Sequence, residues 1–311
     1  MSAILVTAPG FLTTVQDLGR PGHAADGVSA SGAADPLALR IGNRLVGNVE
    51  HAAGLEMTLL GGSFRFEADG LISLTGAEAT AHIGDRTVTP WRPSVVRAGE
   101  TLVTSGLNGG ARGYLCVRGG IAVPLVFGSA STHLLTRMGG YEGRALRSGD
   151  RLAIGAAIRG APHSGAVDPS VIPGYRPGEP FRATEGPQGS WFSSGSHAIL
   201  YETEWRVDEA CDRMGIRLSG PRIEPAVARE LVTEGVPVGA IQLPPSGLPI
   251  LLFVEHQTTG GYPKIANVIA ADLARLGGLK PRETIRFEAI SFTAARTLLH
   301  EQEEALDALF V

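Results

Sequence analysis

Glycine and proline divide this chain into many short segments, and this limits what it can fold into. The 311 residues contain 42 glycines and 20 prolines, and the runs between them are short and rich in β-forming residues. Short apolar runs between turn residues are typical of strands rather than of a helical bundle. The sequence therefore predicts a mainly β protein with a few short helices. We expect strands at Ala3–Thr7, Ser63–Phe66, Leu71–Leu74, Thr80–Ile83, Tyr114–Val117, Arg151–Ile154, Ala198–Tyr201, Glu204–Val207, Ile216–Leu218, Ala240–Gln242, Pro249–Val254 and Thr284–Ala289.

A turn, an acidic residue and a strand recur in that order. The phrase occurs at Ala98–Leu102, Ser148–Leu152 and Pro281–Ile285. The last two lie near the ends of the two halves of the chain, which indicates two barrel-like units of similar construction. Residues 156–180 are rich in glycine and proline without a clear period, as in linkers. We therefore expect an N-terminal barrel at 1–155, a linker at 156–180, and a C-terminal barrel with a final helix at 181–311.

Three helices are expected. Asp35 and Pro36 form a helix start, an N-cap acid before a proline, and an apolar stripe continues to Gly47. A second helix is predicted at about 266–276, where its N-terminal NH groups could face an anionic substrate group. The third is predicted at 293–309 with Thr293 as its cap.

Composition excludes several classes of function. The net charge of -4 and the pI near 6.1 give no basic surplus for nucleic acid or an anionic membrane. Cys116 and Cys211 belong to no CxxC pair, so no metal site is expected and a reducing compartment fits them. The start has no secretory leader, and no run of roughly 18 apolar residues occurs. We expect a soluble, cytoplasmic protein.

Familiar catalytic motifs are missing from the sequence. It contains no GxxxxGK[ST] phosphate loop, no HExxH and no GxSxG. Its two lysines, Lys264 and Lys280, are not in the Met-Lys-Met setting of a biotin carrier, so this chain is not expected to carry biotin itself.

The segment Val254–Pro263 has the densest set of polar groups. An apolar run leads into Glu-His-Gln-Thr-Thr and ends on two glycines. Alternation along a strand would place Glu255 and Gln257 on one face and His256 on the other. His256 could equally be a buried histidine with a structural hydrogen bond.

Three other polar clusters have a structural alternative. Thr13–Arg20 could satisfy a turn after a strand. In the run 212–215, Arg213 could bind a carboxylate through a bidentate pair of hydrogen bonds, or it could form an internal salt bridge. Gly128–Thr132 could be a polar turn and nothing more.

Taken together, these segments resemble the carboxyltransferase-domain family. The resemblance covers nearly the whole chain and runs through Thr13–Arg20, Leu45–Asn48, Leu55–Thr58, Gly128–Thr132, Arg213–Gly215, Gly239–Gln242 and His256–Pro263. The family includes the C subunit of bacterial ATP-dependent 5-oxoprolinase, the antagonist of the Kip kinase inhibitor, allophanate hydrolase subunit 2, and part of urea carboxylase. Three positions depart from its pattern: Glu255 for Asp, Asp212 for Asn, and Thr233 for Ser.

The resemblance implies two cyclophilin-like β-barrel domains and an activity that belongs to a complex. The expected partners are the A and B subunits of that complex, of which the B subunit is Kip-inhibitor-like. ATP would be used by that complex, at a site that this sequence does not locate. The substrate would be a small amide, such as 5-oxoproline, opened to glutamate.

The site hypothesis places the amide in one or two clefts lined by 13–20 and 255–262. His256 is the acid or base, since its ordinary pKa is near neutral. Glu255 would orient it or take the proton, Gln257 and Thr258 would bind the amide, and Arg213 would hold a carboxylate. The catalytic candidates are His256, Glu255 and Gln257, and the substrate-binding candidates are Thr13, Thr14, Gln16, Asp17, Arg20, Arg213, Gln242, Thr258, Thr259, Gly260, Gly261 and Tyr262.

Two other functions stay open. A regulatory protein of the Kip-antagonist type would bind an inhibitor subunit without turnover. A biotin-dependent, urea-type carboxyltransferase would need a biotin carrier and a biotin carboxylase on other chains.

Overall fold

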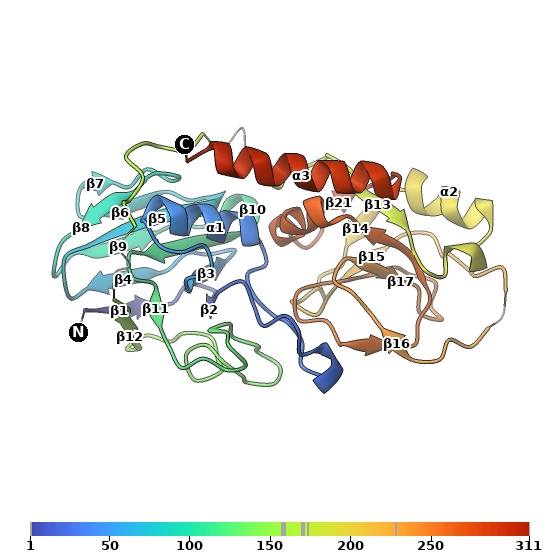
Figure 1. Cartoon of the computed structure of the whole chain (residues 1–311), viewed down its shortest axis with the longest axis horizontal. Helices are drawn as coiled ribbons and strands as arrows, with labels where there is room; N and C mark the ends of the chain where they lie inside the picture. The colour runs from blue at the N-terminus through green and yellow to red at the C-terminus, as the bar shows by residue number, and fades with distance from the viewer. Residues whose placement is uncertain (1, 157–159, 169–171, 173, 228, 311) are drawn as a thin grey trace. The chain divides into compact units, whose positions relative to one another are not determined.

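The computed structural model describes residues 2–156, 160–168, 172, 174–227 and 229–310. The chain divides into two compact units (Figure 1), which are described separately. The first takes in Met1–Arg20, Ser31–Gly174 and Leu306–Val311, and the second Pro21–Ala30 and Tyr175–Ala305. The domain boundaries predicted from the sequence stay a prediction. Part of the predicted linker, residues 157–159, 169–171 and 173, lies outside the described residues.

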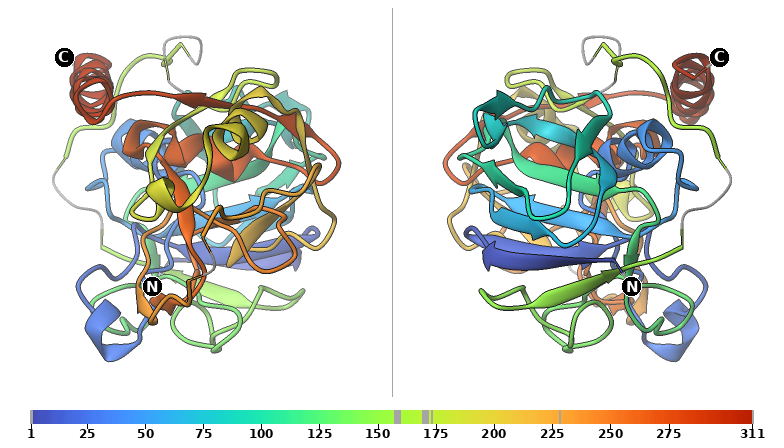
Figure 2. Two further views of the ribbon diagram at one scale, coloured as in Figure 1. Left: turned by 90° about the vertical axis from the view of Figure 1, so that its right-hand side faces the viewer. Right: turned by 90° about the vertical axis from the view of Figure 1, so that its left-hand side faces the viewer.

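The first unit is built from two antiparallel sheets. Their orders are β11-β12-β1-β4-β9-β6-β7 and β2-β3-β10-β5-β8, and the strands curve around one another (Figure 2, right). The strands are β1 (Ala3–Ala8), β2 (Leu12–Gln16), β3 (Gly54–Thr58), β4 (Ser63–Phe66), β5 (Gly70–Glu78), β6 (Ala81–Ile83), β7 (Arg86–Thr87), β8 (Ser94–Val96), β9 (Thr101–Thr104), β10 (Asn108–Val117), β11 (Ile121–Ala122) and β12 (Arg151–Ile154).

One hydrophobic core joins these two sheets. Phe64 and Phe66 of β4 are fully buried and belong to the same cluster as Leu55 of β3 and Leu115 of β10. Alternate residues of a strand face opposite sides, so these strands direct one apolar row inward. Burial of such side chains stabilises the unit by about 1.5–3 kcal/mol each.

Helix α1 (Pro36–Leu45) begins as the sequence predicts. The Asp35 carboxylate accepts a hydrogen bond from the Ala38 amide at 2.9 Å, and Pro36 occupies the first helical position. The buried stripe includes Leu37, Ile41 and Leu45. This prediction is confirmed because the cap and the apolar period are both local signals.

The second unit contains one large sheet and a small ribbon. The eight-stranded sheet has the order β21-β14-β15-β18-β17-β20-β13-β22, and β16 pairs with β19 in the ribbon. Every pair is antiparallel except β13 with β22. The strands are β13 (Phe181–Glu185), β14 (Trp205–Val207), β15 (Gly215–Ser219), β16 (Glu234–Gly235), β17 (Ala240–Gln242), β18 (Ile250–Leu252), β19 (Thr259–Gly260), β20 (Lys264–Val268), β21 (Thr284–Ile285) and β22 (Phe287–Ala289).

The helices of the second unit correct two predictions. Residues 198–201, predicted as a strand, lie in α2 (Ser194–Glu202), which Ser193 caps through a hydrogen bond from the Ser196 amide. The helix predicted at 266–276 is a strand up to Val268 and then a 3-10 helix, Ala270–Gly278. Its start is therefore separated from Val254–Pro263 by all of β20. Apolar runs this short fit a strand or a helix, and the local period alone does not decide between them.

The other helices are short or terminal. Helix α3 (Phe292–Ala308) is the predicted final helix, but Ser291 rather than Thr293 accepts from the Ala294 amide. Short 3-10 turns lie at Ala24–Asp26 and Gly189–Trp191. No helix in the described ranges is long and apolar enough to cross a membrane.

The recurring phrase of turn, acid and strand has the same bonding in all three places. The carboxylates of Glu100, Asp150 and Glu283 each accept from the backbone amide three residues earlier, at 2.7, 2.7 and 2.9 Å. A strand follows each acid at once. The acidic side chain closes the turn that precedes the strand, so this motif has a structural role in both units. The mainly β fold with few helices is confirmed.

Candidate functional site

The polar segment Val254–Pro263 forms a turn and a short ribbon strand, not the end of a long strand. The Glu255 amide donates to the Arg213 carbonyl at 2.7 Å, and the His256 amide donates to the Phe253 carbonyl at 2.9 Å. The second bond closes a turn over residues 253–256, directly after β18 ends at Leu252, and the first ties this turn to Arg213. The predicted alternation of faces for 255–257 is therefore wrong, because the chain bends before it reaches these residues.

Glu255 and Arg213 form a buried ion pair. The Arg213 Nε donates to Glu255 Oε1, and the arginine and glutamate side chains are only 6% and 3% exposed, respectively. The Asp212 carboxylate helps to fix the backbone around Arg213, because it accepts a hydrogen bond from the Met214 amide at 2.8 Å. The carboxylate that Arg213 binds here is thus one of the protein's own. Its predicted binding of a substrate carboxylate, and the predicted pairing of Glu255 with His256, stay predictions.

His256 has the properties of a neutral base. It is partly buried, and its Nδ1 hydrogen-bonds to the Gln257 carbonyl at 2.6 Å. Because a carbonyl only accepts, Nδ1 carries the proton and Nε2 is the acceptor atom of the ring. Burial lowers the pKa of His256 below its ordinary value, and the hydrogen bond to the carbonyl partly opposes this. The ring is therefore neutral near pH 7.

A set of five polar side chains consists of a hydrogen-bonded group of three, whose carboxylate is opposite Gly260 in the ribbon, and a hydrogen-bonded pair of amides beside the same glycine. We call it the Glu234 cluster, and its members are Gln188, Glu234, Gln242, Gln257 and Lys264. They come from five separate segments of the second unit. The cluster therefore depends on the complete fold of that unit.

Lys264 and Gln188 hold one oxygen of Glu234. Lys264 is 1% exposed, and its ammonium donates to Glu234 Oε1. The Gln188 amide nitrogen donates to the same oxygen at 2.8 Å, while its oxygen accepts from the Lys264 backbone amide at 3.1 Å. The hydrogen bond from Lys264, and then that from Gln188, lowers the pKa of Glu234. Glu234 is therefore a fixed carboxylate.

Gln242 supplies a buried donor without a partner. It is opposite Lys264 in the β17–β20 pair and is 1% exposed. Its Oε1 accepts from the Gln257 amide at 3.4 Å, and its Nε2 has no hydrogen-bond partner among the described residues. A Cβ on Gly260 would lie 2.7 Å from that nitrogen. Glycine at 260 therefore lets the Gln242 amide pack against the backbone, and an unpaired buried donor is costly unless a ligand uses it.

Sequence reasoning missed three members of this cluster. Gln188 has no local signal, since it follows a strand in an ordinary turn. Glu234 appeared only beside Thr233, as part of a family departure. Lys264 had a sequence signal. It is one of only two lysines in the chain, and it directly follows Tyr-Pro at the end of the polar segment.

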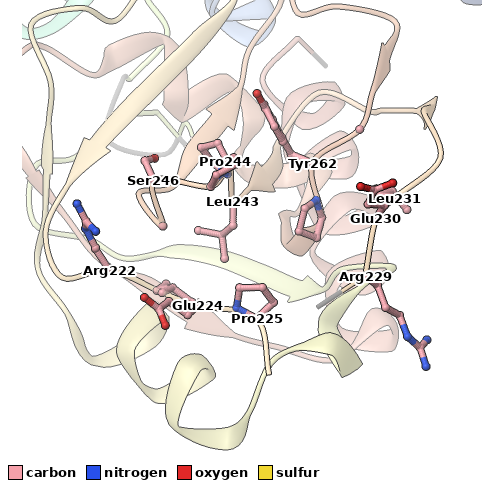
Figure 3. Close-up of a pocket in the computed structure, with 15 residues that line it drawn as sticks. Arg222, Glu224, Pro225, Arg229, Glu230, Leu231, Leu243, Pro244, Ser246 and Tyr262 are labelled. Atoms are coloured by element: carbon pink, nitrogen blue, oxygen red, sulfur yellow. The ribbon is translucent and has the colours of Figure 1, made fainter. Parts of the chain in front are cut away.

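A pocket of about 650 Å³ opens at the end of the same segment. Gly261 and Tyr262 line it together with Leu243 and Pro263, which neighbour Gln242 and Lys264 in sequence. Figure 3 shows Leu243, Pro225 and Pro244 around its middle, with Arg222 and Arg229 on opposite sides and the Arg229 guanidinium pointing away. Two predicted binding residues therefore belong to a largely apolar pocket, whereas Thr258 and Thr259 lie on the preceding turn and ribbon.

In the first unit, Asp17 is saturated with hydrogen bonds. Its carboxylate accepts from the Gly19 amide at 2.8 Å, the Ala130 amide at 2.6 Å, and the hydroxyls of Ser129 and Ser131. The segments Thr13–Arg20 and Gly128–Thr132 are thus partners of one another, which the sequence did not indicate. Together they form what we call the Asp17 cluster.

The neighbours of Asp17 are bound in the same way. Gln16 donates to the Thr132 carbonyl at 3.1 Å and to the Thr14 hydroxyl at 3.0 Å. Arg20 donates to the carbonyls of Val126 and Ser131, and Thr13 donates to that of Pro9. The side chains of Thr13, Thr14, Gln16 and Arg20 are all buried. This geometry favours a structural role, while substrate binding by these residues stays a prediction.

Two acidic residues, Asp35 and Glu56, lie close together in the first unit. Tyr114 donates to Glu56 Oε2 at 2.7 Å and accepts from the Asp35 amide at 2.7 Å. Burial, and then the charge of Glu56, raise the pKa of Asp35 to about 7, against the Ala38 hydrogen bond. The start of α1 is therefore linked to a buried carboxylate. In the described part of the chain, no group of three His, Cys, Asp or Glu side chains could hold a metal ion.

Known proteins match this chain along nearly its whole length. It is 40% identical to the 5-oxoprolinase C subunit of Escherichia coli over 96% of this chain and 95% of that protein. It is 33% identical to the urea amidolyase of Saccharomyces cerevisiae, over 99% of this chain and 18% of that protein.

A solved structure and a family model match as well. The crystal structure of the K. lactis urea amidolyase superposes with a TM-score of 0.91 and 30% identity, over 99% of this chain. The match covers only 20% of the urea amidolyase chain, so this chain spans about a fifth of that protein. The model of the carboxyltransferase domain, subdomain A and B, matches residues 26–289.

Proposed function

The chain belongs to the carboxyltransferase-domain family, subdomain A and B, and from this premise we propose that it is the C subunit of an ATP-dependent 5-oxoprolinase. In this role it helps to bind 5-oxoproline and open it to glutamate. The observation that carries the proposal is the 40% identity to the E. coli protein along both whole lengths. The match to urea amidolyase, in contrast, covers only 18% of that protein.

The second unit supplies the chemistry in this proposal. Lactam hydrolysis needs a donor for the carbonyl oxygen and a base for water. Gln242 and Gln257 present amide nitrogens beside Gly260. His256 is neutral near pH 7, so its Nε2 can take a proton from water and return it to the leaving nitrogen. Thr258, Thr259 and the pocket at Tyr262 complete the surroundings.

The activity belongs to a complex. The proposed partners are its A and B subunits, the B subunit being Kip-inhibitor-like, because the relatives of E. coli and Haemophilus influenzae are both named as the C subunit of 5-oxoprolinase. ATP is a substrate of the complex, and its site is not assigned to this chain. We place the complex in the cytoplasm, where ATP is available and the free thiols of Cys116 and Cys211 stay reduced.

A urea-type carboxyltransferase is the second candidate. The TM-score of 0.91 to the K. lactis enzyme favours it. Biotin would then arrive on another chain, since Lys264 is buried in an ion pair with Glu234. A biotin carboxylase would also have to come from another chain.

The test is co-purification with the subunits encoded nearby, followed by an ATPase assay with 5-oxoproline and with urea. We expect hydrolysis of ATP that depends on 5-oxoproline and yields glutamate. Hydrolysis stimulated by urea, with a biotin carboxylase present, would favour the second candidate. A stable complex with no stimulation by either compound would favour a regulatory binding protein.

A further inference from the structure

We propose that Glu234 is a specificity residue that accepts a hydrogen bond from the substrate amide N–H, while Gln242 donates to the carbonyl of the same amide. This inference rests on the proposed function and deepens it. It assigns the two ends of one amide edge to two residues of the Glu234 cluster.

The first support is the way in which Glu234 is held. Both of its hydrogen bonds reach Oε1, from Lys264 and from Gln188. Oε2 has no hydrogen-bond partner among the described residues, and the side chain is 41% exposed. A carboxylate fixed through one oxygen presents the other as a preorganised acceptor. It suits a donor such as an amide N–H.

The second support is the position of Gln242 relative to Glu234. Glu234 is opposite Gly260 in the β16–β19 ribbon, and opposite residues of an antiparallel pair share a face. The unpartnered Gln242 Nε2 lies beside the same Gly260, where a Cβ would approach it to 2.7 Å. An acceptor and a donor are thus presented at one glycine.

The third support is the shape of a lactam. A five-membered lactam is a cis amide, so its N–H and its C=O point to the same edge of the ring. An acceptor and a donor side by side complement that edge. A lactone of the same shape has a ring oxygen in place of the N–H, and it would face the Glu234 carboxylate without a hydrogen bond.

Charge balance of Lys264 does not account for the whole arrangement. A buried ammonium needs an anionic partner, and Glu234 Oε1 provides it. That need explains neither the exposed second oxygen nor the unpaired nitrogen of Gln242, which is buried and costs free energy without a ligand. Recognition of an amide edge explains both.

The experiment measures binding, so that it does not depend on turnover. Calorimetry on the complex compares 5-oxoproline with its lactone analogue, 5-oxotetrahydrofuran-2-carboxylate. We expect the natural protein to prefer the lactam by roughly tenfold to hundredfold, the range for a hydrogen bond to a charged group. Glu234→Gln should reduce this preference to within about threefold, because an amide can donate to the ring oxygen.

Two further variants keep the test decisive. Glu234→Gln combined with Lys264→Met removes both charges, so no buried ammonium is left alone if the single variant is unstable. Glu209→Gln is the matched control, since Glu209 also pairs with a cation, Arg282, but at an exposed position of the same unit. It should keep the full preference.

The outcomes separate two failures. An unchanged preference for the lactam in the charge-balanced double variant overturns the role of Glu234 and leaves the proposed function intact. If the complex of the natural chain binds no lactam, both the proposed function and this inference fail. Loss of the preference in the Glu234 variants alone supports the inference.

Discussion

Two polar clusters of similar composition differ in whether the protein uses both carboxylate oxygens and the glutamine donor, although Gln16 Oε1 in the first cluster has no partner among the described residues. In the Asp17 cluster of the first unit, the carboxylate accepts four hydrogen bonds from protein groups, and Gln16 donates to a carbonyl and a hydroxyl. In the Glu234 cluster of the second unit, one carboxylate oxygen and one amide nitrogen have no partner among the described residues.

This difference separates structure from recognition. A carboxylate and a glutamine donor that bond to protein groups stabilise the fold and are not open to a ligand. In a fixed network with an unused donor and an unused acceptor, the side chains are already ordered, so less entropy is lost when a ligand binds. Both units contain threonine, glutamine and an acid within a few residues, so composition alone does not distinguish the two cases.

Loss of Asp17 should have the largest effect. Asp17→Ala leaves two hydroxyls and two backbone amides without their acceptor, and we expect the free energy of unfolding to fall by about 3–5 kcal/mol. Denaturant unfolding measures it. Asp69→Ala is the control, because this exposed acid bonds to Arg97 and the Ala98 amide, and its removal should destabilise the protein far less. Equal losses would contradict the structural role.

His256→Ala should act on turnover rather than on folding. We expect kcat for 5-oxoproline-dependent ATP hydrolysis to fall by about 10²–10⁴-fold, the usual range for a general base. The melting temperature should change little, because the ring is only partly buried and bonds to its neighbour's carbonyl. Because burial lowers its pKa, the acid limb of the natural protein's rate profile should lie below about 6.5. A folded, assembled variant with full activity would defeat the assignment.

Gly260→Ala should act on substrate binding. The added methyl group would lie 2.7 Å from Gln242 Nε2 and would push that amide from its position. We expect KM for 5-oxoproline to rise roughly tenfold with a small change in stability. Gly235→Ala is the matched control in the same ribbon, since nothing lies within 4 Å of its Cβ position. Similar KM values for the two variants would count against a binding role of the Gln242 amide.

The smallest effect concerns pH and the first unit. The pKa of Asp35 is raised from 3.8 to about 7, so the folded state keeps a proton that the unfolded chain loses at lower pH. Its stabilisation is complete below pH 3.8 and is lost as the pH rises through about 7. Asp35→Asn keeps the cap and should reduce the loss of stability between about pH 6 and 8 by about 1 kcal/mol. Parallel pH profiles of unfolding for the two proteins would contradict the raised pKa.

Local signals explain what the sequence predicted well. The cap at Asp35, the apolar stripe of α1 and the repeated turn before β9, β12 and β21 depend on neighbours within a few residues. The segment 198–201 was mispredicted because an apolar run of that length fits either a strand or a helix.

Long-range contacts explain what the sequence left out. Lys264 and Glu234 meet across 30 positions, and Asp17 and Ser129 across 112. No period or spacing in the sequence encodes such pairs. The sequence therefore located the polar segment at His256–Pro263 and its neighbours Arg213 and Gln242, but not Gln188, Glu234 and Lys264.

A matched pair of glutamines tests the central claim most directly. Gln16 and Gln242 are both buried amides, one in each cluster. Binding of 5-oxoproline to the complex and thermal unfolding are measured for Gln16→Met and Gln242→Met. We predict that Gln242→Met weakens binding at least about tenfold with little change in melting temperature, and that Gln16→Met lowers the melting temperature with unchanged binding. The opposite pattern, with binding lost only in Gln16→Met, would contradict the account.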